Sequence, residues 1–289
     1  MSDGQLPPVT RGAIAAPVVA EFLASSGMTI DALMLALISL AQTFARPPIS
    51  NFFVGAVAQG SSGSLYFGAN YEFVGQALSF TVHGEQAATA HAIANGETGM
   101  QRLAVSAAPC GYCRQFLYEL TTASTLQILL PNTPPVLLTA LLPDAFGPQD
   151  LGVAAALMSP QAHGMVLSSS PGDAVIEAAL AAANTSYAPY TFGYAGVALK
   201  TRDGSIFTGS VAENAAFNPS MSPLEAAVVS LVISGGKDYG DIIDAVLVEP
   251  ANTEASQSTA TGAVLKAIAS VPLRVYHSHL PLQKEAHPS

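Results

Sequence analysis

The two halves of this 289-residue chain repeat one pattern, a β-type hairpin followed by a helix. The run VGAVA at 54–58 corresponds to AGVAL at 195–199, and EQAA at 85–88, within a predicted helix, corresponds to EAAV at 225–228. Self-similarity of this kind indicates a duplicated unit. The length also suits about two domains. We therefore expect two domains of one fold and not a single large one.

Apolar runs separated by Gly, Pro and Ser predict alternating strands and helices in the first half. The expected elements, in order, are a strand at 52–59, a strand at 65–69, a helix at 83–94, a strand at 103–107, a helix at 109–120 and a strand at 126–130. In the second half we expect a helix at 172–183 and strands at 194–200 and 205–209. This order is typical of a layered α/β domain.

The two cysteines of the chain lie in one short motif. Cys110 and Cys113 form P-C-x-x-C, and His83 and Glu85 form H-x-E upstream. Zinc takes thiolate and imidazole ligands tetrahedrally, and three protein ligands leave the fourth position for water, as a catalytic site requires. The combined pattern is the one that zinc-dependent nucleobase deaminases use. It predicts one catalytic zinc ion per chain, bound by His83, Cys110 and Cys113.

The spacing also predicts how these residues work. Pro109 and the pattern around His83 place both ligand groups at helix N-termini, whose positive dipole ends favour thiolates. Bound zinc lowers the pKa of water to roughly 7. Glu85 is two residues from a ligand and is not itself a ligand. We expect it to accept the water proton and to deliver it to the ring nitrogen and the leaving amine.

Other interpretations of these residues were weighed. A lone C-x-x-C is often a structural zinc knuckle or a redox pair; the preceding proline, the upstream H-x-E and the lack of a nearby fourth ligand favour catalysis. His91 is the rival ligand because it shares the predicted helix with His83. Arg114 is either a donor to a thiolate or an ordinary helix charge. We nevertheless expect every histidine other than His83 on the surface or in the tail: His91, His163, His277, His279 and His287.

The second copy is not expected to bind zinc. Pro223 is predicted to stand where His83 stands, and no cysteine follows it.

Composition excludes several classes of protein. Ten Lys and Arg against twenty Asp and Glu give a formal net charge of −10. Because binding to a phosphate backbone needs clustered basic residues, nucleic acid is an unlikely main partner. Both cysteines are assigned to the motif, which favours a reducing compartment, the cytosol. The N-terminus lacks a basic leader region and the early apolar run at 32–41 is too short to span a bilayer, so we expect no membrane insertion.

The segment from Pro48 to Leu120 resembles the cytidine deaminase family. The resemblance rests on SNF at 50–52, FGANYEF at 67–73, HGEQ at 83–86 and APCGYCRQF at 108–116, and it continues through 142–151, YAPY at 187–190 and ENAAFNP at 213–219. The long, duplicated, homodimeric type of plants and some bacteria fits best. It implies a three-layer α/β/α domain, duplicated, with a small N-terminal helical module.

The resemblance also implies roles for further residues. Asn70 and Glu72 would hold the ribose 3′-hydroxyl, Phe52 would pack on the pyrimidine, and Phe146 would close over the base. Gly84 replaces the family's usual alanine and would offer its backbone N–H to the pyrimidine O2. Asn70 and Glu72 also make sense unaided, because residues i and i+2 of an extended segment point the same way and a carboxylate accepts sugar hydroxyls while repelling phosphate.

Alternatives for these residues stay open. Asn70 and Glu72 could form a turn with a solvated charge, Phe53 competes with Phe52 for stacking, and Phe146 could be a core anchor.

Four parts follow from these patterns. They are an N-terminal helical module at 1–46, with its second helix starting at Thr29 or Asp31, a zinc catalytic domain at 47–150, a linker at 151–171 and a degenerate non-catalytic domain at 172–289.

We therefore expect an enzyme of pyrimidine salvage that hydrolyses cytidine and 2′-deoxycytidine to the uridines with release of ammonia. A homodimer would complete each site with material from the neighbouring subunit. A polynucleotide deaminase ranks second, and an inactive zinc-bearing scaffold third.

Overall fold

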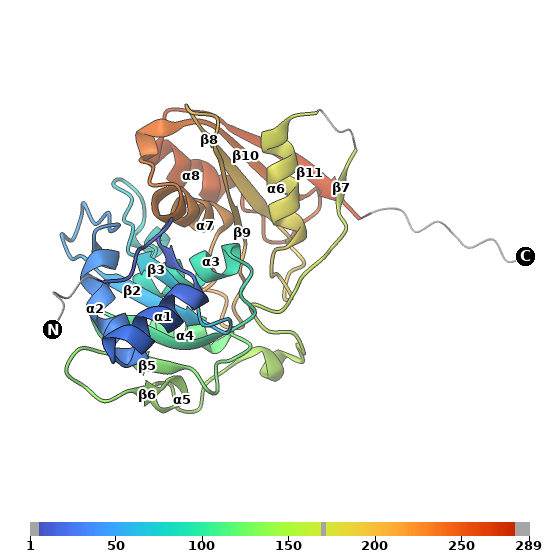
Figure 1. Cartoon of the computed structure of the whole chain (residues 1–289). Coiled ribbons are helices and arrows are strands. Elements are labelled where there is room, and N and C mark those ends of the chain that lie inside the picture. The colour runs from blue at the N-terminus through green and yellow to red at the C-terminus, as the bar shows by residue number, and fades with distance from the viewer. Residues whose placement is uncertain (1–5, 169–171, 281–289) are drawn as a thin grey trace, which may run out of the picture.

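The structure is a computed structural model that describes residues 6–168 and 172–280. Its two halves lie one above the other in Figure 1, the first coloured blue to green and the second yellow to red. Each half is built on one β-sheet covered by helices. The predicted duplicated α/β fold is confirmed.

The first sheet has six strands in the order β1-β3-β2-β4-β5-β6. β4 and β5 are parallel, and the other neighbouring pairs are antiparallel. The strands are β1 (Ala13–Ile14), β2 (Gly55–Gly60), β3 (Leu65–Ala69), β4 (Met100–Val105), β5 (Gln127–Leu129) and β6 (Val136–Leu137).

The second sheet has five strands in the order β7-β11-β10-β8-β9, with β10 and β11 parallel and the other pairs antiparallel. The strands are β7 (Val166–Leu167), β8 (Gly196–Thr201), β9 (Ile206–Ser210), β10 (Ile242–Pro250) and β11 (Leu273–His279). The run β9-β8-β10-β11 repeats β3-β2-β4-β5 in order and direction, which confirms the predicted repeat.

The helices follow the predicted order, with boundaries shifted by a few residues. They are α1 (Ala16–Ser26), α2 (Ile30–Gln42), α3 (Gly84–Ala94), α4 (Gly111–Tyr118), α5 (Leu138–Leu141), α6 (Ala174–Asn184), α7 (Pro223–Val229) and α8 (Ser258–Ile268). One π-helical turn at Ser230–Ser234 continues α7, and short 3₁₀ turns occur at Leu78–Phe80, Pro148–Leu151 and Tyr239–Asp241.

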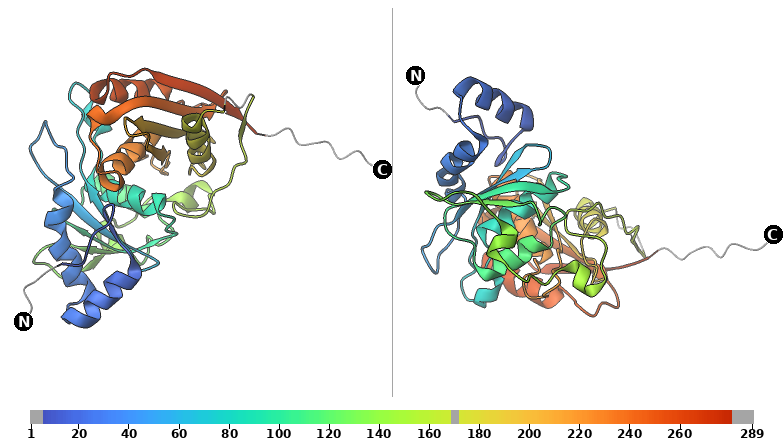
Figure 2. Two further views of the ribbon diagram at one scale, coloured as in Figure 1. Left: turned by 45° about the horizontal axis from the view of Figure 1, so that its top comes forward. Right: turned by 90° about the horizontal axis from the view of Figure 1, so that it is seen from below.

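The N-terminal helices pack on the first half. Thr29 caps α2 as predicted, because its hydroxyl oxygen accepts a hydrogen bond from the Ala32 N–H at 3.2 Å. Helix α2 lies against the first sheet, whereas α1 stands off from it in the right-hand view of Figure 2 and has Val19 as its buried residue. The buried residues of α2 recur at helical spacing and face that sheet: Leu33, Met34, Leu37, Ile38 and Ala41.

Two glycines show that helices cover both faces of the first sheet. A Cβ on Gly55 would lie 2.5 Å from Ile38 O of α2, and a Cβ on Gly68 would lie 2.2 Å from Gly84 O of α3. Gly68 pairs with Ala56, the residue after Gly55 in β2. Successive strand residues face opposite sides. Helices α2 and α3 therefore lie on opposite faces, as a three-layer domain requires.

The second half repeats both close approaches. A Cβ on Gly196 would lie 2.3 Å from Ala183 N of α6, and a Cβ on Gly209 would lie 2.1 Å from Ala227 N of α7. Helices α6 and α7 thus correspond to α2 and α3.

These contacts correct the predicted register between α3 and α7. Gly68 faces Gly84 O, and Gly209 faces Pro223 O. Gly84 therefore corresponds to Pro223, and the prediction that Pro223 stands at the position of His83 is wrong.

Ser222 occupies the position of His83, and Leu224 occupies that of Glu85. His83 and Ser222 each precede a helix and each donate their backbone N–H to the side chain three residues later. Matching glutamate to glutamate in the sequence shifted the alignment by one residue. The corrected register leaves the second half without a counterpart of the His83 imidazole and of the Glu85 carboxylate.

The end of the segment predicted as a linker joins the second sheet. Val166 and Leu167 of β7 pair with His279 and Ser278 of β11. β7 thus occupies the edge position that β6 has in the first sheet, although it precedes the rest of its half in the chain. The last part of that segment, 169–171, lies outside the described residues.

Among the described residues, no single helix is long and apolar enough to cross a membrane. Helices α1 and α2 meet the length and hydropathy criteria only when they are taken together, and the pair is bent by 112°.

The corrected register generates a test at Glu225, the counterpart of Gln86. The Glu225 carboxylate is buried, accepts the Ser222 N–H at 2.8 Å, and has a pKa raised by burial from 4.5 to about 7. Between those two pH values the folded protein holds a proton that the unfolded chain has lost, so this group makes stability fall as pH rises. At about 1.4 kcal/mol per unit, its contribution reaches roughly 3 kcal/mol.

We expect Glu225→Gln to keep the hydrogen bond from the Ser222 N–H, because Gln86 accepts the equivalent bond from the His83 N–H. The variant should no longer lose stability as the pH rises. Urea unfolding at pH 5 and pH 8 would then show a smaller drop in the variant than in the wild type. Equal drops in both proteins would contradict the assignment.

Candidate active site and metal centre

Two helix N-termini meet at the predicted zinc ligands. His83 is the N-cap of α3, and Cys110 is the N-cap of α4, with Cys113 in the first turn of α4. Both helices therefore begin where the sequence predicts. Their unpaired N–H groups and dipoles create positive potential at the shared point, which stabilises thiolates.

The spacing of the donor atoms fits zinc. Cys110 Sγ lies 3.7 Å from Cys113 Sγ, and His83 Nδ1 lies 3.6 Å and 3.2 Å from Cys110 Sγ and Cys113 Sγ. With zinc–ligand distances of about 2.3 Å for sulfur and 2.0 Å for nitrogen, tetrahedral geometry places sulfurs about 3.8 Å apart and sulfur and nitrogen about 3.6 Å apart. The three atoms thus form one face of a tetrahedron.

One of the two thiols is prepared to lose its proton before a metal binds. A hydrogen bond between them lowers the pKa of Cys110 to about 5 and, together with burial, raises the pKa of Cys113. The pair therefore holds one proton at neutral pH, and zinc binding displaces it. A soft thiolate pair with one imidazole is a donor set that zinc prefers. His83, Cys110 and Cys113 would hold the ion.

Glu85 lies in the first turn of α3, between the ligand and the helix body. Its side chain is buried, and burial raises its pKa. A carboxylate whose charged form is destabilised in this way is a stronger base than an exposed one, which favours proton transfer from water. Glu85 does not belong to the group of described residues whose ligand atoms converge within 4.8 Å, so its predicted role as a proton carrier stays a prediction.

This is one group of metal-binding side chains, and it belongs to the first half. We considered every His, Cys, Asp and Glu among residues 6–168 and 172–280. The side chains that bring three or more ligand atoms within 4.8 Å of one another are His83, Cys110 and Cys113. At the corresponding place in the second half, Ser222 and Leu224 offer neither an imidazole nor a carboxylate.

Asn70 and Glu72 bind the 49–54 loop in this structure. Asn70 accepts the Val54 N–H at 2.9 Å and donates to Phe52 O at 2.8 Å. The Glu72 carboxylate accepts the N–H groups of Ile49 and Ser50 at 2.8 and 2.9 Å and the Ser50 hydroxyl at 2.5 Å. Both side chains are buried, so a turn with a solvated charge is excluded.

Hydrogen bonding also fixes the charge of Glu72. Burial works against ionisation of its carboxyl group, but the hydrogen bonds from Ser50 and Ile49 outweigh it and lower the pKa. A carboxylate offers about four acceptor positions, so capacity remains for a sugar hydroxyl.

Glu72 has a twin in the second half. Glu213 accepts the N–H groups of Tyr190 and Thr191 at 2.9 and 3.3 Å and also the Thr191 hydroxyl. This network persists in the half without ligands. Part of the role of Glu72 is therefore to shape its loop.

The three phenylalanines considered for base binding lie in loops and are exposed. Phe52 is 59% exposed, Phe53 is 51% exposed and Phe146 is 44% exposed. The alternative of Phe146 as a core anchor is therefore wrong. Exposure does not decide between Phe52 and Phe53.

Gly84 lies against Val54. A Cβ at Gly84 would lie 2.9 Å from Val54 Cγ1, which explains how glycine fits at this position.

The rival residues are placed away from the donor atoms. His91 is 1% exposed with its Nδ1 3.0 Å from Phe67 O, so its predicted surface position is wrong; the sheet-facing side of α3 buries it. Arg114 donates to Pro109 O and Leu141 O, both at 2.8 Å, and neither predicted role holds. His163 is partly buried against Ser186 O and Tyr194. His277 and His279 are exposed, and His287 lies outside the described residues.

Sequence reasoning missed four polar residues around the site. Gln86 donates to Pro219 O at 3.4 Å and Tyr112 donates to Asn218 O at 2.5 Å, so both bind the second half. Gln115 and Glu119 bind it as well. The spacing of Tyr112, Gln115 and Glu119, three and then four residues, was the available signal for a shared helix face.

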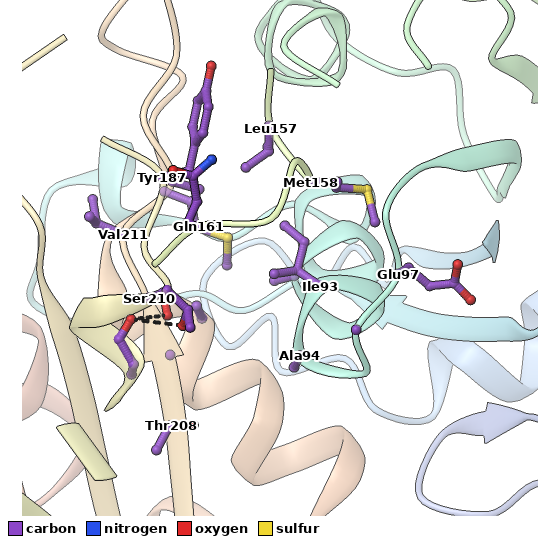
Figure 3. A pocket seen from close by; sticks show the side chains of 18 of the residues that line it. Ile93, Ala94, Glu97, Leu157, Met158, Gln161, Tyr187, Thr208, Ser210 and Val211 are labelled. Atoms are coloured by element: carbon purple, nitrogen blue, oxygen red, sulfur yellow. Dashed lines mark hydrogen bonds between the residues drawn. The ribbon is translucent and has the colours of Figure 1, made fainter. Parts of the chain in front are cut away.

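A cavity of about 670 Å³ lies between the halves and apart from this site (Figure 3). Ile93 and Ala94 from the last turns of α3 line one side, and Tyr187 and Val211 line another. None of the predicted site residues is among the described residues that line it.

Comparison with known proteins covers both halves. Residues 28–128 match the family described as the cytidine and deoxycytidylate deaminase zinc-binding region, and residues 138–262 match a second family of the same description. Cytidine deaminase of Aeromonas salmonicida (strain A449) is 50% identical over 255 residues, 88% of this chain and 86% of its own length. That of Cronobacter sakazakii (strain ATCC BAA-894) is 48% identical over 255 residues, 88% of this chain and 85% of its own.

A solved structure, cytidine deaminase from Mycobacterium tuberculosis, is 32% identical and covers 42% of this chain and 99% of its own, with a TM-score of 0.38.

Proposed function

The chain belongs to the cytidine deaminase family, whose members are zinc-dependent hydrolases, and on that premise we propose where and on which nucleosides it acts. The reaction converts cytidine to uridine with release of ammonia, and we propose that 2′-deoxycytidine is converted in the same way. We assign zinc binding to His83, Cys110 and Cys113 and proton transfer to Glu85. The observation that carries this assignment is the tetrahedral face formed by the three donor atoms, with Glu85 in the adjoining helical turn.

The chemistry needs one base and one acid in turn. Bound zinc supplies a Lewis acid that lowers the pKa of water to roughly 7. Glu85 takes the proton of the attacking water and gives it to N3 of the pyrimidine while the water oxygen bonds to C4. Glu85 then takes the proton of the new C4 hydroxyl and gives it to the amino group; the C4=O bond forms as the C4–N bond breaks, and ammonia leaves. The raised pKa of Glu85 suits both transfers.

We assign the sugar to Asn70 and Glu72. The Glu72 carboxylate is ionised and retains acceptor capacity toward a hydroxyl, and its charge repels a 5′-phosphate. These properties support a nucleoside substrate over a nucleotide or polynucleotide. The net charge of −10 supports the same choice.

We assign the base to the N-terminus of α3 and to two aromatic side chains. Gly84 is the first residue of α3, where backbone N–H groups lack helical partners and can donate to the pyrimidine O2. Phe52 would stack on the ring, and Phe146 would close over it. Gln115 donates to Phe146 O at 2.7 Å and so ties this loop to the zinc-binding helix α4.

We further propose a cytosolic homodimer that serves pyrimidine salvage. The cysteines are free thiols, which suits a reducing compartment. Large apolar side chains are exposed on the loops around the two equivalent sites, as an interface requires: Phe52, Phe53, Val74, Leu78, Phe192 and Phe217. We propose that the first half up to residue 150 is the catalytic domain, with β1 in its sheet and α2 as one of its layers, that 151–165 is a linker, and that the second half with β7 is a scaffold domain. The predicted boundaries at 46 and 171 are therefore not kept.

Sedimentation equilibrium tests the dimer. We expect a mass of twice the 29.5 kDa of one chain at micromolar concentration. A single-chain mass at that concentration would contradict the proposal.

Glu85→Gln tests the mechanism. The amide keeps the size of the side chain but cannot carry the proton, so turnover should fall by at least about a thousandfold. Zinc should stay at one ion per chain, because Glu85 is not a ligand. Ammonia release from cytidine and metal content are measured on the same preparations.

Wild-type turnover in this variant would remove Glu85 from the mechanism. A wild type with full zinc and no ammonia release from cytidine would point instead to a polynucleotide substrate, which single-stranded DNA and RNA would reveal.

Glu72→Gln and Glu213→Gln form a matched pair, since both carboxylates hold equivalent loops. Each variant should lose similar stability, about 1–2 kcal/mol, because a charge-assisted acceptor is replaced. Only Glu72→Gln should also raise the KM for cytidine, by about tenfold, because only its carboxylate faces a catalytic site. Urea unfolding and steady-state kinetics measure the two effects. Equal KM values in both variants would reduce Glu72 to a loop-forming residue.

A further inference from the structure

One face of α4 contacts the second half of the chain. This face carries Tyr112, Gln115 and, at the C-terminal end of the helix, Glu119. The three residues are spaced three and four positions apart and so lie on one side of the helix. All three form hydrogen bonds with residues 214–219, hereafter the 214–219 segment. This segment connects β9 to α7.

The contacts run along the whole length of the helix. Tyr112 donates to Asn218 O at 2.5 Å. Asn214 donates its side-chain amide to Gln115 O at 2.9 Å, and the Glu119 carboxylate accepts the Ala215 N–H at 2.9 Å.

Glu119 fixes the contact at the C-terminal end of α4. Its side chain is fully buried, and its carboxylate also accepts the Tyr187 hydroxyl at 2.7 Å and the Tyr190 hydroxyl. Burial raises the pKa values of both tyrosines, so they remain neutral donors. The 214–219 segment is therefore held at one end by a buried polar group of the first half.

The same segment reaches the other zinc-binding helix. Gln86, in the first turn of α3, donates to Pro219 O at 3.4 Å, and its side-chain oxygen accepts the N–H of His83 at 3.2 Å. Tyr112 lies between the two cysteine ligands, and its ring centroid is 5.8 Å from that of His83. The segment thus contacts the N-terminal turns of both helices that carry ligands.

Helix α3 also packs along α7 within one hydrophobic core, but its C-terminal end borders a cavity. The last turns of α3, at Ile93 and Ala94, line the cavity of about 670 Å³ (Figure 3). A wall that faces a cavity lacks partner atoms and is less restrained. The N-terminal end of α3, where the zinc ligand lies, therefore has polar contacts with the second half in addition to the apolar packing against α7.

We propose that the 214–219 segment sets the relative position of the N-terminal turns of α3 and α4, and hence of the three zinc-binding atoms, with Tyr112 as the principal positioning residue. This inference rests on the proposed zinc site. The second half would then position the metal ligands of its own chain. It can do so although it has no counterparts of His83 and Glu85. Tyr112 does not touch the reacting atoms; it acts through the helix on which Cys110 and Cys113 lie.

Tyr112→Phe tests the inference by removing the bond to Asn218 O while keeping the ring beside His83. Zinc-loaded protein is mixed with an excess of a chromogenic chelator, and the first-order rate of zinc loss is measured. We expect zinc to leave roughly three- to tenfold faster than from the wild type, the scale of one neutral hydrogen bond. Tyr118→Phe is the matched control, because it makes the same chemical change on the same helix away from the 214–219 segment. It should lose zinc at the wild-type rate.

Hydrogen exchange gives an independent readout. In Tyr112→Phe, backbone amides of the 214–219 segment should exchange faster, whereas those of β10 should not change. If Tyr112→Phe does not fold, Asn214→Ala, which removes the bond to Gln115 O, takes its place with the same two expectations.

A wild-type rate of zinc loss in the folded variant would overturn the inference, as would an equal acceleration in Tyr118→Phe. Neither result would affect the proposed function, which would fail only if the wild type bound no zinc or released no ammonia from cytidine.

Discussion

The position of three donor atoms is the constraint on which the structure depends. Tetrahedral zinc needs His83 Nδ1 and the two cysteine sulfurs within about 4 Å of one another, and here they lie 3.2 to 3.7 Å apart. They come from two helices that follow different strands. Gly68 lets the first of these helices approach, because any Cβ there would lie 2.3 Å from Ala88 N. The Arg114 hydrogen bond to Pro109 O then fixes the loop that leads into the second.

Comparison of the halves separates the fold from the chemistry. Gly209 repeats Gly68, Glu213 repeats Glu72, and the cap at Ser222 repeats the one at His83. What the second half lacks are counterparts of the His83 imidazole, the Glu85 carboxylate and both thiols. A sequence can lose ligands one by one while the close helix–strand contacts, which decide folding, persist. This explains why residues 138–262 still match a family described by its zinc-binding region.

The sequence was sufficient for the parts that depend on local pattern. The ligand motif, the cap at Thr29, the alternation of strands and helices and the hairpin repeat at 54–58 and 195–199 all follow from short-range spacing. The register of α7 did not follow, because two glutamates offered a false match and only the contact of Gly209 decides it. His91 was misplaced because α3 is buried on most sides, so its polar residues carry no periodic signal. Contacts such as Tyr112 to Asn218 join residues more than 100 positions apart, and spacing alone does not reveal such a partner.

The most direct test of this account is anomalous diffraction at the zinc edge from crystals grown with a cytidine analogue. The account predicts one zinc peak per chain, bounded by His83, Cys110 and Cys113, with the pyrimidine C4 facing the open fourth position beside Glu85. A peak in the second half, or a fourth protein ligand that closes the coordination sphere, would contradict it.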